Sequence, residues 1–280
     1  MSHFKDMPIV ILGDSHPEMA LIADSIEGSF NLSLGSERHT ENYKKLRVLS
    51  DTYALRLVIV GLSYHSFLCP RKKLNSNEIQ RRLDFYYKYC FTLYPFIRKE
   101  KRQEHMEMFD RSTMREVMLC YELGIPSRNS VAQIKQFLRG YPITALPSTL
   151  VAPIPIDWEN RIMRHFYEKD TSLREIDYSC IAGVGEIDSF CKEKGYTLIL
   201  FNAPLPQSYY VHIPLVYKQL TDSVVNALVD NQTTFYLDYT QYPLPDSCFR
   251  DGDHTNLYGA NIITPLVRDS LRALGLLPTH

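Results

Sequence analysis

Five short apolar segments recur along the chain, and each of them ends in turn-forming residues. They are rich in residues that favour strands and are apolar on both faces, as strands buried inside a parallel sheet are. They are residues 8–13, 30–35, 55–61, 197–204 and 234–239. We therefore predict five buried parallel strands.

Segments with the apolar spacing of amphipathic helices separate these strands. They are residues 17–27, 41–50, 78–98, 111–123, 131–138, 157–167, 173–194, 214–230 and 256–274. Alternation of strands and helices is typical of a doubly wound domain with helices on both faces of the sheet. The pattern predicts a three-layer α/β/α fold with a flavodoxin-like parallel sheet of about five strands.

The connection between the third and fourth predicted strands is much longer than one crossover helix requires. It is mostly helical in pattern, and no linker that would separate two domains is evident. We therefore expect a single domain over residues 1–280, with a helical insertion at about 66–196.

The charges of the chain are nearly balanced, with 31 lysine and arginine residues against 32 aspartate and glutamate residues. This balance gives no electrostatic basis for a nucleic acid or an anionic membrane as a partner. The first apolar run, residues 8–12, is far shorter than a signal-peptide core or a membrane span. We expect no membrane segment and a cytoplasmic protein as written, or a secreted or periplasmic one if a leader or anchor has been removed.

Six cysteines are spread along the chain, without a C-x-x-C pair or a histidine at the spacing of a zinc site. They are Cys69, Cys90, Cys120, Cys180, Cys191 and Cys248. We expect reduced core residues, and we expect no metal and no other cofactor.

The segment VILGDSHPEM, residues 10–19, places Ser15 directly after the first predicted strand. Ser15 and Glu18 fit the S-x-x-E capping box, whose two side chains satisfy free backbone donors at a helix start, and Pro17 suits the first turn. Ligands of open α/β sheets, however, bind beyond the carboxyl ends of the strands, where Ser15 is expected. Ser15 is therefore either a helix cap or a nucleophile.

A second segment, CFRDGDHTNLYGA at residues 248–260, contains groups that could activate such a serine. A serine nucleophile requires a base, and the base requires an orienting carboxylate. Asp251 and His254 are three residues apart in a turn before the last helix, so the carboxylate can reach the imidazole. A D-G turn with a surface histidine is the alternative interpretation.

GDS after the first strand, together with D-x-x-H before the last helix, resembles the SGNH/GDSL hydrolase family. The likeness covers residues 8–66 and 197–270, and is strongest to divergent bacterial members with GxSHPE in place of GDSL. It implies a serine esterase or acyltransferase in which Ser15 is the nucleophile, His254 the base and Asp251 its partner. The implied substrates are small acyl esters, acetyl above all, of a carbohydrate or a similar alcohol.

The resemblance also implies an oxyanion hole that uses the backbone N–H groups of Ser15 and Gly35. The family's third block reads Gly-x-Asn-Asp, whereas the third strand here is followed by Gly-Leu-Ser-Tyr-His-Ser, without an asparagine. Ser63, His65 or Ser66 is the expected substitute. Since losing one such donor lowers the rate roughly a hundredfold or more, we expect reduced but real activity.

The loop after the fourth strand, NAPLPQSYYVHIP at residues 202–214, places polar and aromatic groups at the same edge of the sheet. Asn202, Gln207 and Tyr209 are therefore candidate substrate contacts, although prolines in a turn explain the composition equally well.

Two other functions fit parts of the sequence. A non-catalytic SGNH-like module that binds a glycan or an acyl group would explain the missing asparagine. Asp14 and His16 form the D-x-H with which metallophosphoesterase sites begin, but the GDxxD and GNH[DE] motifs that would supply further ligands do not occur. A serine esterase that acts on a small-molecule or carbohydrate ester remains the preferred prediction.

Overall fold

The computed structural model describes residues 9–69 and 156–278. Of these, residues 44–53, which include the C-terminal part of helix α2 (His39–Thr52), belong to one compact unit. All the other described residues belong to a second unit, which contains the whole sheet. Every candidate site residue named above lies in this second unit.

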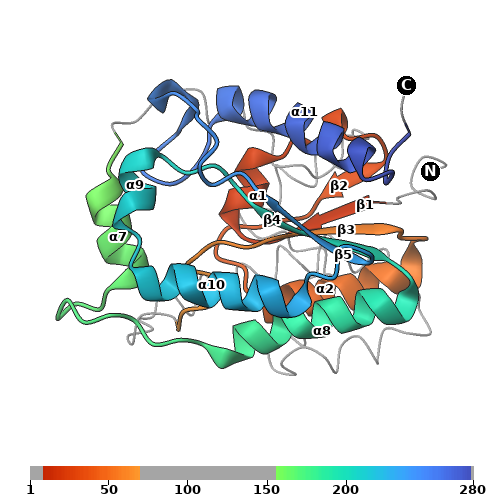
Figure 1. Cartoon of the computed structure of the whole chain (residues 1–280), viewed down its shortest axis with the longest axis horizontal. Helices are drawn as coiled ribbons and strands as arrows, with labels where there is room; N and C mark the ends of the chain where they lie inside the picture. Colours follow the sequence, from red (N-terminus) through yellow and green to blue (C-terminus); the bar gives the residue numbers. More distant parts are fainter. Residues whose placement is uncertain (1–8, 70–155, 279–280) are drawn as a thin grey trace, which may run out of the picture. The chain divides into compact units, whose positions relative to one another are not determined.

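A single five-stranded sheet forms the centre of this unit, with the order β2-β1-β3-β4-β5 and all neighbouring strands parallel (Figure 1). The strands are β1 (Ile9–Leu12), β2 (Ser29–Asn31), β3 (Leu57–Gly61), β4 (Thr197–Asn202) and β5 (Thr234–Asp238). The predicted fold class is confirmed. Because the chain leaves β1 toward β2 and leaves β3 toward β4, which lie on opposite sides, the loops after β1 and β3 diverge and leave room for a site.

Alternate residues of the strands face two helical layers, as the period of a strand requires. On one face, Ile9 and Ile11 of β1 share a buried cluster with Ile263 and Val267 of helix α11 (Leu257–Ala273). Helix α1 (Ser15–Ala20) lies on the same side and contacts α11. Helices α8 (Tyr178–Lys194) and α10 (Leu215–Leu228) lie on the opposite side (Figure 1). The sheet is therefore covered by helices on both faces.

Helix α1 is shorter than the predicted segment 17–27. It ends at Ala20, and a short 3-10 helix, η1 (Ala23–Ser25), follows. The side-chain amide of Asn31 donates to the carbonyl oxygens of Pro17 and Leu21, at 2.8 and 2.9 Å. The Pro17 carbonyl also accepts the capping N–H of Leu21, whereas the Leu21 carbonyl is the acceptor that a further helical turn would use, so the bond from Asn31 to Leu21 favours the end of the helix there.

Two other boundaries differ from the predicted ones. The loop predicted at 202–214 contains a helix, α9 (Gln207–His212), which begins after Pro206. Helix α8 begins at Tyr178 rather than at residue 173, because the side chain of Asp177 caps it by accepting from the Ser179 N–H at 3.0 Å. Helix α7 (Trp158–Phe166) agrees with the predicted segment 157–167.

Some predictions fall outside the described residues. They are the helices at 78–98, 111–123 and 131–138, and most of the insertion at 66–196. Cys90 and Cys120 also lie there, whereas Cys180, Cys191 and Cys248 are buried free thiols, and Cys69 is a free thiol that is only half-buried. Over residues 9–69 and 156–278, no helix has both the length and the apolar character that crossing a membrane requires.

Candidate functional site

The turn between β1 and α1 brings Ser15 to the carboxyl edge of the sheet. Gly13 has a φ of 144°, and a Cβ atom added there would lie 2.5 Å from Pro17 Cγ. A Cβ added to Gly61, at the end of β3, would lie equally close to Pro17. Only glycine fits at these two positions, since no side chain can occupy the space that the proline ring fills. Pro17 packed between two glycines therefore fixes the start of α1.

Asp14, rather than Ser15, caps this helix. The Asp14 carboxylate accepts from the His16 N–H at 2.9 Å, and Glu18 accepts from the Gly35 N–H at 2.7 Å. The capping box proposed for Ser15 and Glu18 is therefore wrong, because aspartate supplies the cap one residue earlier. The Ser15 hydroxyl is left available for another partner.

That partner is His254. Ser15 Oγ lies 2.7 Å from His254 Nε2, and His254 Nδ1 lies 2.9 Å from Asp251 Oδ1. The same carboxylate oxygen accepts from the His254 backbone N–H at 3.1 Å, which holds the short loop in shape. The structure thus brings together the three residues that the sequence analysis selected, at the distances of a hydrogen-bonded Ser-His-Asp set.

The loop that carries His254 is held at both ends. Phe249 and Thr255 form an isolated antiparallel bridge, and Asn256 caps α11 by accepting from the N–H groups of Tyr258 and Gly259. The Asn256 amide also donates to the carbonyl oxygen of Phe249, at 3.2 Å. The imidazole is therefore positioned by the start of the last helix.

A second carboxylate, missed by the sequence analysis, contacts the same imidazole. Asp253 is fully buried, and its carboxylate lies 3.1 Å from His254 Nδ1 and 3.5 Å from His16 Nε2. Helix α7 contributes Arg161, whose Nε is 3.2 Å from Asp253, and His165, whose Nδ1 is 3.4 Å from it. Arg161 also lies 2.5 Å from Asp251 through Nη2.

A sequence signal for these residues existed but was incomplete. Asp253 stands next to His254 in the DGDH segment, so its proximity could have been suspected. Arg161 and His165 are four residues apart in a predicted helix and therefore share one face. Nothing in the sequence, however, connects that face with the loop around His254.

These carboxylates control the protonation of His254. Burial by itself would lower the pKa of this imidazole, but the negative charge of Asp253 and the hydrogen bond to Asp251 outweigh it and raise the pKa to about 10. In return, and against the effect of burial, contact with His254 lowers the pKa of both carboxyl groups. The neutral form of His254, which can accept a proton, therefore becomes abundant only in alkaline solution.

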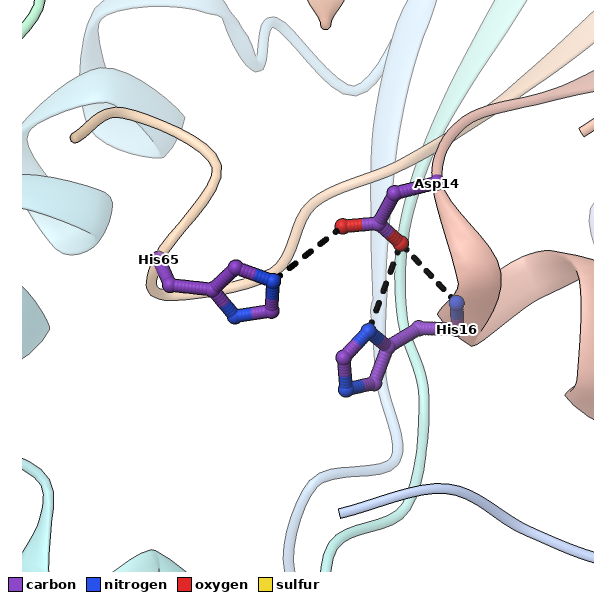
Figure 2. Close-up of side chains that lie close together, drawn as sticks. All are labelled: Asp14, His16 and His65. Atoms are coloured by element: carbon purple, nitrogen blue, oxygen red, sulfur yellow. Dashed lines mark hydrogen bonds and ion pairs between the residues drawn. The ribbon is translucent and has the colours of Figure 1, made fainter. Parts of the chain in front are cut away.

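Three more histidines lie in the interior beside this set. The His16 ring is 4.8 Å from that of His254 and 5.2 Å from that of His65, and the His65 ring stacks on His165 at 4.1 Å. Burial lowers the pKa of His65 to about 4 and also lowers that of His165. Figure 2 shows His16 and His65 both turned toward the carboxylate of Asp14.

The oxyanion donors implied by the family resemblance are only partly arranged as expected. Gly35 does lie beside the nucleophile, since a Cβ atom added to it would be 3.7 Å from Ser15 Cβ. Its N–H, however, already donates to Glu18.

The Ser63 N–H donates to Ser66 Oγ at 3.2 Å, and that hydroxyl donates to Asp14. His65 also faces Asp14, with 3.7 Å between His65 Nε2 and Asp14 Oδ2.

The three candidate substrate contacts lie in different surroundings. Asn202 is buried and donates to the Tyr236 hydroxyl at 3.0 Å, and Tyr209 is buried with its hydroxyl 2.7 Å from His165 Nδ1. Gln207 is exposed at the first position of α9. A small pocket is lined by His16, Ser63, Tyr64, His65, Asn202, Ala203, Leu205 and Tyr209. Two of the three candidates therefore line a pocket, and Gln207 does not.

In comparisons with known proteins, the chain matches no protein-family model and no curated protein.

Proposed function

We propose that the chain is a serine esterase or acyltransferase of SGNH type that acts on small acyl esters, acetyl above all, of a carbohydrate or a similar alcohol. The observation that carries the proposal is the continuous pair of hydrogen bonds from Ser15 Oγ to His254 Nε2 and from His254 Nδ1 to Asp251, at 2.7 and 2.9 Å. A hydroxyl is a weak nucleophile, and this arrangement is the one that activates it.

In the proposed reaction, the Ser15 oxygen attacks the ester carbonyl carbon while His254 Nε2 takes the hydroxyl proton. Asp251 keeps the imidazole in the orientation that presents Nε2 to the serine. His254 then returns the proton to the departing alcohol, which leaves an acyl group on Ser15. Water completes a hydrolysis and a second alcohol completes a transfer, with His254 again acting as the base.

A non-catalytic module that binds an ester or a glycan is the second candidate. It is favoured by the Gly35 N–H, which donates to Glu18 instead of standing free for a developing oxyanion. Hydrolysis requires that donor, or another, to point at the carbonyl oxygen as negative charge develops there. The two functions make opposite predictions for chemical reactivity.

The test combines an assay on short-chain aryl esters with labelling by a serine-directed fluorophosphonate, both in alkaline buffer. The native chain is expected to hydrolyse aryl acetate and to take up one label, and Ser15→Ala is expected to lose label and at least about 10³-fold in rate. Ser223→Ala, which removes an exposed hydroxyl bonded to the Gln219 carbonyl on α10, is the matched control. If the native chain neither turns over the ester nor is labelled, the binding module is the better assignment.

A further inference from the structure

Beside Ser15, but not part of its hydrogen-bonded set, three side chains converge from two segments of the chain. Asp14 and His16 come from the junction of β1 and α1, and His65 comes from the loop after β3 (Figure 2). Asp14 Oδ1 lies 3.3 Å from His16 Nδ1, and Asp14 Oδ2 lies 3.7 Å from His65 Nε2. One ligand atom from each residue lies within 4.8 Å of the others.

The 3.3 Å separation of Asp14 Oδ1 and His16 Nδ1 is that of a long hydrogen bond and also fits two ligands of one small ion, whereas the 3.7 Å separation of Asp14 Oδ2 and His65 Nε2 is too long for a hydrogen bond. In a tetrahedral zinc site with bonds of about 2.0–2.2 Å, neighbouring ligand atoms are separated by about 3.3–3.6 Å. Good N–H···O bonds are shorter, at about 2.7–3.2 Å. The role of Asp14 as a helix cap explains its own position, but it does not explain why His65 turns toward it from another loop.

The side chains around the cluster are arranged as they are around metal ligands. Histidine ligands commonly direct their second ring nitrogen at a carboxylate, and His16 Nε2 faces the buried carboxylate of Asp253 at the ion-pair distance of 3.5 Å, which is longer than a good hydrogen bond. The Ser66 hydroxyl donates to Asp14 Oδ2 at 3.2 Å, which orients that carboxylate. The His65 ring stacks on His165, which limits its rotation.

The pocket next to the cluster provides an independent observation. His16 and His65 line it together with Ser63, whose hydroxyl oxygen is buried and has no hydrogen-bond partner among the described residues. A buried hydroxyl without a partner costs free energy, so such a group indicates a water molecule or a ligand that the pocket accommodates. A metal ion with three protein ligands needs such space for a fourth ligand.

We propose that Asp14, His16 and His65 bind one divalent transition-metal ion, with Zn²⁺ as the best match to two imidazoles and one carboxylate, and that its fourth position faces the pocket lined by Ser63. The proposal goes beyond the esterase function and does not depend on it. Since Asp14 and His16 flank Ser15 in the sequence, the ion would lie beside the proposed nucleophile without using its hydroxyl.

The direct test is calorimetric titration of the chelator-treated full chain with ZnCl₂, supported by metal analysis after dialysis. One Zn²⁺ per chain is expected. Asp14→Asn retains a residue that caps helices but loses the charge, and His65→Ala loses one ligand. Each is expected to weaken Zn²⁺ binding at least about a hundredfold, more than the loss of an outer-shell partner does. With Co²⁺ as the probe, the native chain should show the visible bands of a tetrahedral site.

The matched control is His212→Ala, which removes an exposed histidine stacked on Trp158 and should leave Zn²⁺ binding unchanged. Circular dichroism shows whether each variant folds.

Ser15→Ala should keep one Zn²⁺ while it loses ester hydrolysis, so the two proposals can fail separately. Absence of stoichiometric binding by the native chain overturns the site, and so does binding that survives both Asp14→Asn and His65→Ala. Binding that is lost in His254→Ala but retained in His65→Ala assigns the ion to His16, Asp253 and His254 and overturns the ligand set proposed here.

Discussion

Asp14, Ser15 and His16 are consecutive in the chain, yet their side chains belong to two different groups of interactions. Ser15 joins His254 and Asp251, with 2.7 Å between Ser15 Oγ and His254 Nε2 and 2.9 Å between His254 Nδ1 and Asp251 Oδ1. Asp14 and His16 join His65, with 3.3 Å between Asp14 Oδ1 and His16 Nδ1 and 3.7 Å between Asp14 Oδ2 and His65 Nε2. The first two distances are those of groups that share a proton. Of the second two, 3.3 Å is a long hydrogen bond that also fits two ligands of one ion, and 3.7 Å is too long for a hydrogen bond.

The difference shows how one tight turn can serve two chemistries. Asp14 is held by capping α1, which turns its carboxylate inward, and the next residue begins the helix. Ser15 is then free to approach the loop before α11. Asp253 lies between the two groups, because its carboxylate contacts both His254 and His16.

The largest effect is expected from Arg161→Ala, because Arg161 contacts both Asp251 and the fully buried Asp253. Removing the guanidinium leaves two carboxylates to share the single imidazolium of His254, and the free energy of unfolding should fall by about 2–4 kcal/mol. Denaturant titration followed by circular dichroism measures the change. Arg164→Ala on the exposed side of the same helix is the control, and an equal loss in both variants would contradict the role given to Arg161.

A change in pH dependence is expected from Asp253→Asn. In the native chain the rate of ester hydrolysis should rise with pH toward about 10, because His254 must lose a proton to act as the base and its pKa is raised to about 10. Removing the charge of Asp253 stabilises the imidazolium less, so the pKa falls and the rising limb moves to lower pH by about one unit or more.

The pH profile of kcat/KM for an aryl acetate measures this shift, with Asp246→Asn, an exposed aspartate of η5 (Asp246–Cys248), as the control. A rising limb of the pH profile that stays in place, or that moves to higher pH, would show that Asp253 does not set the protonation of His254.

The smallest effect is expected from Glu18→Ala, which removes the acceptor of the Gly35 N–H. The freed N–H can turn toward a developing oxyanion, and we expect kcat to rise about three- to tenfold, less than the roughly hundredfold contribution of a fully aligned donor. Glu18→Gln keeps an acceptor at this place and should give a smaller increase. A loss of activity in Glu18→Ala would mean that the contact supports the site instead of blocking a donor.

Much of the fold could be predicted because its signals are local. The strands are continuous apolar runs, and four of the five observed strands lie within the predicted ranges. The second strand begins one residue earlier, at Ser29, and ends at Asn31, where the predicted range continued to residue 35. The early end of α1 could not be predicted, since it depends on the Asn31 side chain, which reaches the helix only once the sheet has formed.

The residues of the site also divide into those that the sequence indicates and those that it does not. Asp251 and His254 are close in sequence and Ser15 follows a strand, which made each of them a candidate, and the resemblance to the SGNH/GDSL family joined the three. Arg161 and His165 come from a helix whose position no local pattern indicates. The partner of the Gly35 N–H was also beyond prediction, because Glu18 was assigned to a cap that Asp14 provides.

The hydrogen bond between Ser15 and His254 joins residues that are 239 positions apart in the sequence. On a ribosome that adds 5–20 residues per second, the serine is made roughly 10–50 s before its partner histidine. Throughout that interval the nascent chain carries an ordinary, unreactive hydroxyl, so the proposed activity begins only when the last helix has been synthesised and has packed against the first.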